Sequence, residues 1–215
     1  MDRLIPFTPD VYVGMIEGYN VGLWPAQLVG LAFIWTMIVC ARRRGRANAG
    51  IALTIIAGFW IWVGYGFHLE RYAQLNWAAV AFGWIFIAQG LLMLLWGATS
   101  KKADVRLQAD MRSVLGLLLI ITSLGLHPLL TYIADWPIAA GQTAGMAPLS
   151  LVLLSFGGLA FLTRRPPLWL IAVPVLWCIW EFAWAWTLNL WPDCIAAAIA
   201  VLSGVLCALP RAEKQ

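Results

Sequence analysis

The sequence predicts an all-α integral membrane protein, a helical bundle of about seven transmembrane helices. Of its 215 residues, 62% are hydrophobic and only 11% are charged, whereas an ordinary soluble domain has about 25% charged residues. Seven spans of ~20 residues would use ~140 residues, so the loops must be short and no second, soluble domain fits. The composition excludes secreted, nucleic-acid-binding and disordered proteins. The lipid bilayer is the first partner that it implies.

Seven continuous apolar runs supply the predicted spans. At about 1.5 Å per residue, each run is long enough, or nearly so, to cross ~30 Å of hydrocarbon. In chain order they are Leu23–Ala41, Ala49–Phe67, Trp77–Ala98, Val114–Ala134, Ala147–Thr163, Leu168–Asn189 and Cys194–Leu209. The fifth and the seventh are the shortest. The chain therefore divides into an N-terminal interfacial segment (1–22), a transmembrane bundle (23–209) and a cytoplasmic tail (210–215).

The distribution of basic residues predicts the orientation. One side of a seven-span bundle collects twelve of them, whereas the other side has only Arg3 and Arg71. Positively charged loops stay in the cytoplasm, which predicts an outer N-terminus and an inner C-terminus in a bacterial cytoplasmic (inner) membrane. The same rule explains the net charge of +4 without a nucleic-acid partner. The twelve residues are Arg42, Arg43, Arg44, Arg46, Lys101, Lys102, Arg106, Arg112, Arg164, Arg165, Arg211 and Lys214.

A short interfacial helix is predicted before the first span. Thr8-Pro9-Asp10 combines an N-cap residue, a proline for the first turn and an acid near the positive end of the helix dipole. We expect the helix to run from Pro9 to about Asn20 on the outer face. A mobile extramembrane arm is the alternative. Small residues that would allow another helix to approach closely recur at four-residue spacing, as Gly14, Gly18 and Gly22.

Ionisable residues inside the predicted spans are the main indication of function, because a charge within hydrocarbon is costly. Glu181 is the one acidic or basic residue well within a span, and His127 is the other ionisable residue at depth. Each lies ~20 Å from the inner end of its span, so the two match in depth in the outer half. We predict that they pair or face one wet cavity. A structural hydrogen bond between helices is the alternative.

Tryptophans surround Glu181 along the predicted helix. Trp177 and Trp184 precede and follow it by four and three residues, which puts all three side chains on one face. Trp180 extends this aromatic wall. A carboxylate between indole rings suits an organic cation, which it attracts by charge and by cation–π interaction. Packing against neighbouring helices or lipid is the alternative.

Further polar residues complete the candidate ligand-binding site. His68 lies at the outer end of the second span, and the amides of Gln27 and Gln89 are placed to face the same interior, although interhelical hydrogen bonds explain the amides equally well. Metal-ligating residue types occur on the outer side, namely His68, Glu70, Asp135, Asp193 and Cys194. Since these come from separate loops, solvated loop ends are the alternative, and the question of a metal stays open.

Motifs of several enzyme classes do not occur in the sequence. There is no GxxxxGK[ST], GxSxG, HExxH or GxGxxG pattern, so we predict that the protein is not an enzyme, and no cofactor is predicted. Lys101, Lys102 and Lys214 all fall in an inner loop or the tail. A retinal protein needs a lysine within the membrane, so seven spans do not indicate a rhodopsin here.

Two stretches carry a resemblance to a known family. The first comprises Pro6-Phe7-Thr8-Pro9, Tyr19-Asn20 and Trp24-Pro25-Ala26-Gln27; the second comprises Phe67-His68, Asn76-Trp77-Ala78-Ala79, Phe82-Gly83 and Gln89-Gly90. They resemble a family of bacterial multi-pass membrane proteins catalogued as domain of unknown function 6064. The resemblance implies an inner-membrane location and no particular activity. Where that family often carries a Cys-Pro-Thr-like stretch after the fourth span, this chain reads Gly145-Met146-Ala147-Pro148-Leu149-Ser150.

The leading hypothesis is a small inner-membrane transporter, or a permease-like binder of a small solute, cation or proton. Its site would be lined by Glu181, His127, Trp177 and Trp184. One alternative is a non-catalytic accessory or assembly subunit that meets a membrane-protein partner or a second copy of the chain. The other is a haem- or pigment-binding protein that uses His68 or His127.

Overall fold

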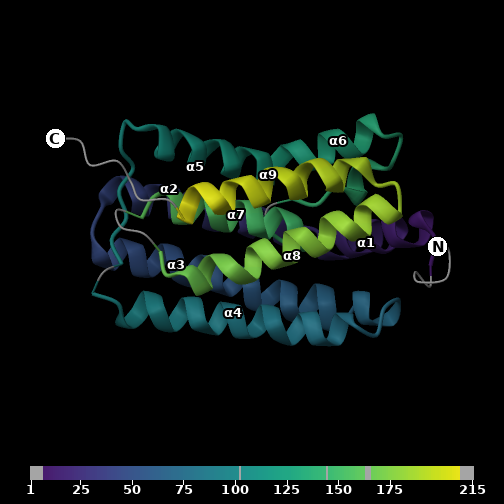
Figure 1. Ribbon diagram of the computed structural model, residues 1–215, viewed down its shortest axis with the longest axis horizontal. Helices are drawn as coiled ribbons and strands as arrows, with labels where there is room; N and C mark the ends of the chain where they lie inside the picture. The colour runs from purple at the N-terminus through teal and green to yellow at the C-terminus, as the bar shows by residue number, and fades with distance from the viewer. Residues whose placement is uncertain (1–6, 102, 144, 163–165, 209–215) are drawn as a thin grey trace.

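A computed structural model of the chain describes residues 7–101, 103–143, 145–162 and 166–208. These residues are all-α, as predicted, with only isolated bridges from Val105 to Gly45 and to Leu162 in place of strands. Most of the helices run lengthwise, side by side, in an elongated bundle (Figure 1). In chain order they are α1 (Pro9–Leu23), α2 (Ala26–Arg43), α3 (Arg46–Trp62), α4 (Ala79–Thr99), α5 (Met111–Ile121), α6 (His127–Ile133), α7 (Pro148–Ala160), α8 (Leu168–Thr187) and α9 (Trp191–Ala208).

Short segments of other helical types continue or join these helices. The π-helix η1 (Val63–Leu69) extends α3, and the π-helix η3 (Thr122–Leu126) joins α5 to α6. The 3-10 turns η2 (Tyr72–Gln74) and η4 (Ile138–Ala140) lie in the connections that follow α3 and α6. The π-helical turns matter for the site because such turns recur at functional positions, and both histidines lie in or directly after one.

Within the described residues, six helical stretches are long and apolar enough to cross a membrane. They are Ala26–Arg43, Arg46–Gln74, Ala79–Thr99, Met111–Ile133, Leu168–Thr187 and Trp191–Ala208. Each overlaps one predicted span, and the remaining predicted span, Ala147–Thr163, corresponds to α7. That helix has only 13 residues, or ~20 Å at ~1.5 Å per residue, which is short of the ~30 Å hydrocarbon core.

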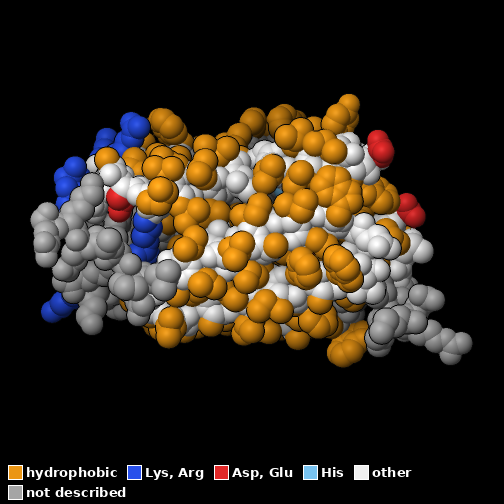
Figure 2. All heavy atoms as spheres, turned by 45° about the horizontal axis from the view of Figure 1, so that its top comes forward, with side chains coloured by type: hydrophobic (Ala, Val, Ile, Leu, Met, Phe, Trp, Pro, Cys, Tyr) orange, Lys and Arg blue, Asp and Glu red, His pale blue; other side chains and the backbone are white. Residues whose placement is uncertain are grey.

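Charged side chains separate along the long axis of the bundle (Figure 2). We call the end where Lys and Arg gather the basic end; its described basic residues are Arg42, Arg43, Arg44, Arg46, Lys101, Arg106 and Arg112. Glu70, Arg71 and Asp135 lie at the opposite end. Six basic residues used in the orientation prediction fall outside the described residues, as does the predicted tail 210–215; they are Arg3, Lys102, Arg164, Arg165, Arg211 and Lys214.

Helix α7 forms the centre of the bundle. Every residue from Pro148 to Ala160 is buried, and α7 contacts α3, α5, α8 and α9. A helix that is apolar on all sides suits this position. The residues between η4 and α7, from Gly141 to Ala147, are not helical where they are described, and they are buried or half-buried. Their backbone N–H and C=O groups therefore need hydrogen-bond partners inside the protein.

The predicted N-terminal helix is present and begins at Pro9, as expected. Tyr12, Ile16 and Tyr19 form its buried face. Gly14 and Gly18 lie on the exposed face, and no atom of the described chain comes within 4 Å of a Cβ built on either. The close helix contact that their spacing predicts is therefore not made within the described residues. Location at a membrane interface stays a prediction for this helix.

Glycines bring α3 and its extension η1 close to α4. A Cβ at Gly90 of α4 would lie 2.8 Å from the Ala57 carbonyl oxygen of α3. A Cβ at Gly64 of η1 would lie 2.7 Å from the carbonyl oxygen of Gly83 in α4. Both distances are shorter than real Cβ contacts, so the backbones touch because these positions lack side chains. Small residues at helix interfaces in membranes stabilise association in this way.

We expect Gly90→Ala to lower the free energy of unfolding by about 1–3 kcal/mol, because the added methyl group forces the helices apart. The matched control is Gly58→Ala in α3, where no atom lies within 4 Å of the new Cβ. That change should be neutral or add up to about 1 kcal/mol through helix propensity. Unfolding of both variants in mixed micelles, followed by circular dichroism, measures the difference. A Gly90→Ala variant as stable as Gly58→Ala would contradict the close packing of α3 and α4.

Candidate functional site

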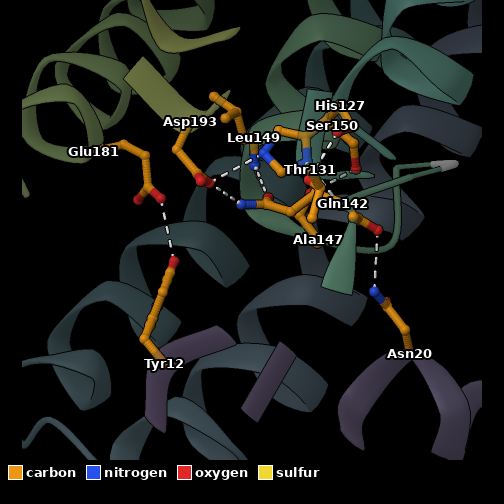
Figure 3. Close-up of polar contacts among 11 residues, drawn as sticks. Tyr12, Asn20, His127, Thr131, Gln142, Ala147, Leu149, Ser150, Glu181 and Asp193 are labelled. Atoms are coloured by element: carbon orange, nitrogen blue, oxygen red, sulfur yellow. Dashed lines mark hydrogen bonds and ion pairs between the residues drawn. The ribbon is translucent and has the colours of Figure 1, made fainter. Parts of the chain in front are cut away.

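Glu181 lies on α8 and faces the interior of the bundle, with 3% of its surface exposed. Its Oε1 accepts a hydrogen bond of 3.2 Å from the Tyr12 hydroxyl of α1 (Figure 3). Burial, and then the nearby charge of Glu181, raises the pKa of Tyr12. The hydroxyl therefore keeps its proton and remains a donor to the carboxylate. The deep carboxylate predicted from the sequence is thus buried, and α1 supplies its partner.

His127, the first residue of α6, is 2% exposed and uses both ring nitrogens. Its Nε2 lies 3.1 Å from Oδ1 of Asp193 on α9, and its Nδ1 lies 3.0 Å from the backbone nitrogen of Gln142. A backbone N–H only donates, so Nδ1 must be the acceptor. The proton of the neutral imidazole is then on Nε2, which donates to Asp193. The two contacts therefore select one tautomer of His127.

Gln142 joins three helices at this site and is fully buried. Besides its backbone bond to His127 of α6, its Nε2 donates to Oδ1 of Asp193 on α9 over 3.1 Å. Its Oε1 accepts from the backbone N–H of Leu149 in the first turn of α7, over 2.9 Å. The N-terminus of an α-helix has N–H groups without intrahelical partners, and Gln142 supplies one such partner inside the bundle.

Side chains of α1 bind the non-helical backbone before α7. Asn20 Nδ2 donates to the carbonyl oxygens of Ala139 and Gly141, over 2.7 and 3.1 Å. The Tyr19 hydroxyl donates to the Met146 carbonyl oxygen over 2.8 Å. Non-helical backbone at membrane depth is tolerated where the protein itself satisfies its polar groups. These bonds explain why α1 packs against this segment.

Glu181 and Asp193 are two buried acids from successive helices, α8 and α9. In Figure 3 the Glu181 carboxylate is directed at Tyr12, and the Asp193 carboxylate is directed at His127 and Gln142. Asp193 lies between Glu181 and His127 (Figure 3), and His127 pairs with Asp193 instead of with Glu181. The first residues of α9, which begins at Trp191, supply this acid. The alternative that Glu181 and His127 face one wet cavity stays a prediction. We call the five residues of this site the polar network: Tyr12, Glu181, Asp193, His127 and Gln142.

The part of the chain that contains the polar network matches a known protein family. The profile of the family of unknown function DUF6064 matches residues 10–215. The chain belongs to this family. The match confirms the family resemblance seen in the sequence, and it spans every residue of the polar network from Tyr12 to Asp193. The comparisons with curated proteins and with solved structures give no match.

The tryptophans near Glu181 belong to one aromatic cluster. Trp177 packs against His68, with ring centroids 4.9 Å apart. Trp180 and Trp184 stack on each other at 6.3 Å, and Phe82 contacts both Trp177 and Trp180, at 5.2 and 5.5 Å. Among the described residues, the indole N–H groups of Trp177 and Trp184 have no hydrogen-bond partner. The aromatic wall predicted from the sequence therefore packs within this cluster, and a cation cage stays a prediction.

His68 lies in η1 and is fully buried. Neither of its ring nitrogens has a hydrogen-bond partner in the described part of the chain, whereas His127 uses both of its nitrogens. Of the two, His68 is thus the one with a nitrogen free for an axial haem bond. However, Phe86 and Trp177 stand against its ring, at 4.5 and 4.9 Å between centroids, so a porphyrin would have to displace them.

The two glutamine side chains predicted for the site make interhelical or local hydrogen bonds. Gln27 Nε2 donates to the Asn20 carbonyl oxygen over 2.7 Å, and so supports the α1 residue that binds the non-helical segment. Gln89 Nε2 donates to the Leu170 carbonyl oxygen of α8 over 3.3 Å. Leu170 lies about three turns from Glu181 along α8. Gln27 therefore adjoins the polar network, and Gln89 belongs to a separate contact between α4 and α8.

The metal-ligating residue types at the loop ends do not come together. In the described residues there is no group of three or more His, Cys, Asp and Glu side chains that could hold a metal ion. Asp135 is exposed, while Asp193 is 6% exposed and pairs with His127. The interpretation of Asp193 as a solvated loop end is thus wrong, because it lies in the first turn of α9 and neighbouring segments cover that turn.

Proposed function

We propose that this DUF6064 protein is a small multi-pass membrane transporter that binds a proton or small cation at Glu181 and Asp193 and moves a small solute. The observation that carries the proposal is the presence of two buried carboxylates in one polar network, with 3% of Glu181 and 6% of Asp193 exposed (Figure 3). His127 is the one side chain of the network that can carry a positive charge. With both acids ionised, the network would hold one or two uncompensated negative charges, which is costly in a low-dielectric interior. A bound proton or cation removes that cost.

The bonding of Glu181 supports a ligand role rather than a structural one. Asn20 and His127 bond to main-chain atoms between η4 and α7, and the Gln142 side chain bonds to the first turn of α7. These residues therefore hold the non-helical segment in place. Glu181 bonds instead to the side chain of Tyr12. A buried ionisable group that the backbone does not need is a functional candidate in a membrane protein.

The interrupted passage before α7 also supports transport. Transporters commonly place ligand sites where a membrane helix is broken and a half-helix begins, because the freed backbone and the helix dipole face the ligand. Here the non-helical segment between Gly141 and Ala147 leads into α7, and the α7 N-terminus bonds to Gln142, which also bonds to Asp193. Asp193 is therefore linked through Gln142 to the break in the passage.

The proposed topology follows from the positions of the basic residues. We place the basic end in the cytoplasm, by the positive-inside rule, and the N-terminus outside. The six membrane-length stretches and the passage that contains α7 then make seven crossings of a bacterial inner membrane. The polar network lies in the outer half, so the site is nearer to the external solution.

Infrared spectroscopy of the protein in lipid tests the binding site. We expect a protonated-carboxyl band that both Glu181→Gln and Asp193→Asn alter, because the two acids share one proton. If a cation is the ligand instead, added Na⁺ or K⁺ should shift the carboxylate bands of the same two residues. Glu17→Gln, at a half-buried position on α1, is the control and should leave these bands unchanged. Bands that neither variant alters would contradict the proposal.

A further inference from the structure

A cleft of about 400 Å³ opens at the end of the bundle opposite the basic end, between α1 and the connection from α3 to α4. None of its lining residues belongs to the polar network. Helix α1 contributes Tyr19, Gly22 and Leu23, and the other wall consists of Trp62, Tyr65, Gly66, Glu70, Arg71 and Gln74. In the proposed topology the cleft lies at the outer membrane surface. Ligand binding in this cleft does not depend on ion binding at Glu181.

Two opposite charges line the cleft without forming an ion pair in the described structure. Glu70 and Arg71 are both exposed, and no ion pair joins them in the part of the chain that the structure describes. Glu70 shares this wall of the cleft with Tyr65. The Arg71 guanidinium extends toward α1, where its Nη2 would lie 3.7 Å from a Cβ built on Gly22. The cleft therefore presents a negative and a positive group on different parts of its wall.

Aromatic rings fill the rest of the wall. Trp62 and Tyr65 are 42% and 54% exposed, while Tyr19 is buried and its hydroxyl accepts a 3.2 Å hydrogen bond from Trp62 Nε1. Ring faces attract ammonium groups, and exposed Trp and Tyr are typical of the depth where lipid headgroups lie. Gly22 and Gly66 add no side chains, which leaves room for a ligand between the rings and the two charges.

The position of Arg71 is itself unusual for a membrane protein. It is the one basic side chain that the described residues place away from the basic end. Basic residues on the outer side oppose the positive-inside rule, so a ligand role accounts for this exception. A guanidinium binds phosphate with two parallel hydrogen bonds, whereas a carboxylate accepts N–H bonds from an ammonium. A ligand that carries both a phosphate and an ammonium group can bind Arg71 and Glu70 at the same time.

We infer that the cleft binds a phosphoethanolamine group, with the phosphate on Arg71 and the primary ammonium on Glu70 and the Trp62 and Tyr65 rings. Two sources share this chemistry. One is a zwitterionic phospholipid whose acyl chains run along the lipid-facing side of α1 and α3. The other is free O-phosphoethanolamine from the external solution. In both cases the site is a headgroup-recognition site separate from the buried carboxylates.

Binding measurements with the purified full-length protein test this assignment. The probes are short-chain phosphatidylethanolamine, phosphatidylglycerol, which lacks the ammonium, and soluble O-phosphoethanolamine. Arg71→Gln should weaken binding of both phospholipids by about ten-fold, because each loses a charge-assisted phosphate bond. Glu70→Gln should weaken the binding of phosphatidylethanolamine by about five-fold or more, because the ammonium group binds to that carboxylate. The same variant should bind phosphatidylglycerol as tightly as the wild type or more tightly, because this lipid has no ammonium group. Displacement by O-phosphoethanolamine indicates the free source; binding of the phospholipid alone indicates the membrane source.

The controls separate this site from general charge effects and from the polar network. Asp135→Asn removes an exposed acid at the same end but outside the cleft, and Arg42→Gln removes an exposed cation at the basic end; neither should change lipid binding. Glu181→Gln should not change it either, so failure of the transport proposal leaves this test intact. Thermal unfolding checks that each variant is folded. Equal binding of the two phospholipids by the wild type, or a Glu70→Gln effect that is the same on both, would overturn the assignment.

Discussion

Proteoliposomes that contain the Glu181→Gln variant will show no more ion flux than liposomes without protein. Glutamine keeps the size of the side chain but removes the charge that binds a proton or cation. Loss of a buried charged partner costs about 2–5 kcal/mol, which corresponds to a fall in binding affinity for the ion of about 30-fold or more. The measurement is the response of a trapped pH-sensitive dye to an imposed proton gradient, repeated with Na⁺ and K⁺ gradients and ion-sensitive dyes.

Two further variants make the flux experiment specific. Glu17→Gln makes the same chemical change on the half-buried side of α1 and should retain wild-type flux. Tyr12→Phe removes only the hydrogen bond donated to Glu181, so flux should remain while its dependence on pH changes. A folded Glu181→Gln protein with wild-type flux would contradict the proposed role of this residue. So would a wild-type protein that moves none of the three ions.

Asp193→Leu will lower the free energy of unfolding by about 3–5 kcal/mol, the cost of breaking a buried charge pair by removing one partner. Oδ1 of Asp193 accepts from both His127 and Gln142. Leucine has a similar shape but no acceptor, so two buried donors lose their partner at once. The measurement is reversible unfolding in mixed micelles. The helices affected are α6 and α9, together with the start of α7 through Gln142.

Asp193→Asn is the matched control, because it keeps an oxygen that can accept both hydrogen bonds while it removes the charge. We expect it to cost about 1 kcal/mol or less in stability, although it should impair ion flux much as Glu181→Gln does. The two substitutions at one position therefore separate the structural role of Asp193 from its charge. An Asp193→Leu protein as stable as the asparagine variant would show that these bonds do not hold the network together.

Most of the helical framework is predictable because it follows from local hydrophobicity. A run of about twenty apolar residues has few alternatives to a membrane-length helix, and the described spans overlap the predicted ones. The exception is the span predicted at Ala147–Thr163. Its apolar run continues to the basic end, but the helix is only Pro148–Ala160. Hydrophobicity alone does not distinguish a membrane-length helix from a short central helix that follows a buried extended segment.

The candidate site was only partly predictable, and the reason differs from residue to residue. Glu181 stands out because a carboxylate in the middle of an apolar run is costly wherever the helix packs. Asp193 follows Trp191-Pro192 directly, a pattern that is equally typical of an exposed helix start. Gln142 lies in a stretch without periodicity, and its three partners come from α6, α7 and α9. No local signal distinguishes such a residue from a loop glutamine.

The amino-acid sequence alone predicts the all-α class, most of the membrane-length helices, the helix that begins at Pro9 and the one carboxylate deep in a span. These features depend on composition and on neighbours within a few turns. The packing of the helices determines that Asp193, not Glu181, pairs with His127, that Tyr12 bonds to Glu181, and that Trp177 packs against His68. Each of these contacts joins different helices. Their existence depends on how the helices are rotated and how far each extends past its neighbours, which hydrophobicity along one helix does not specify.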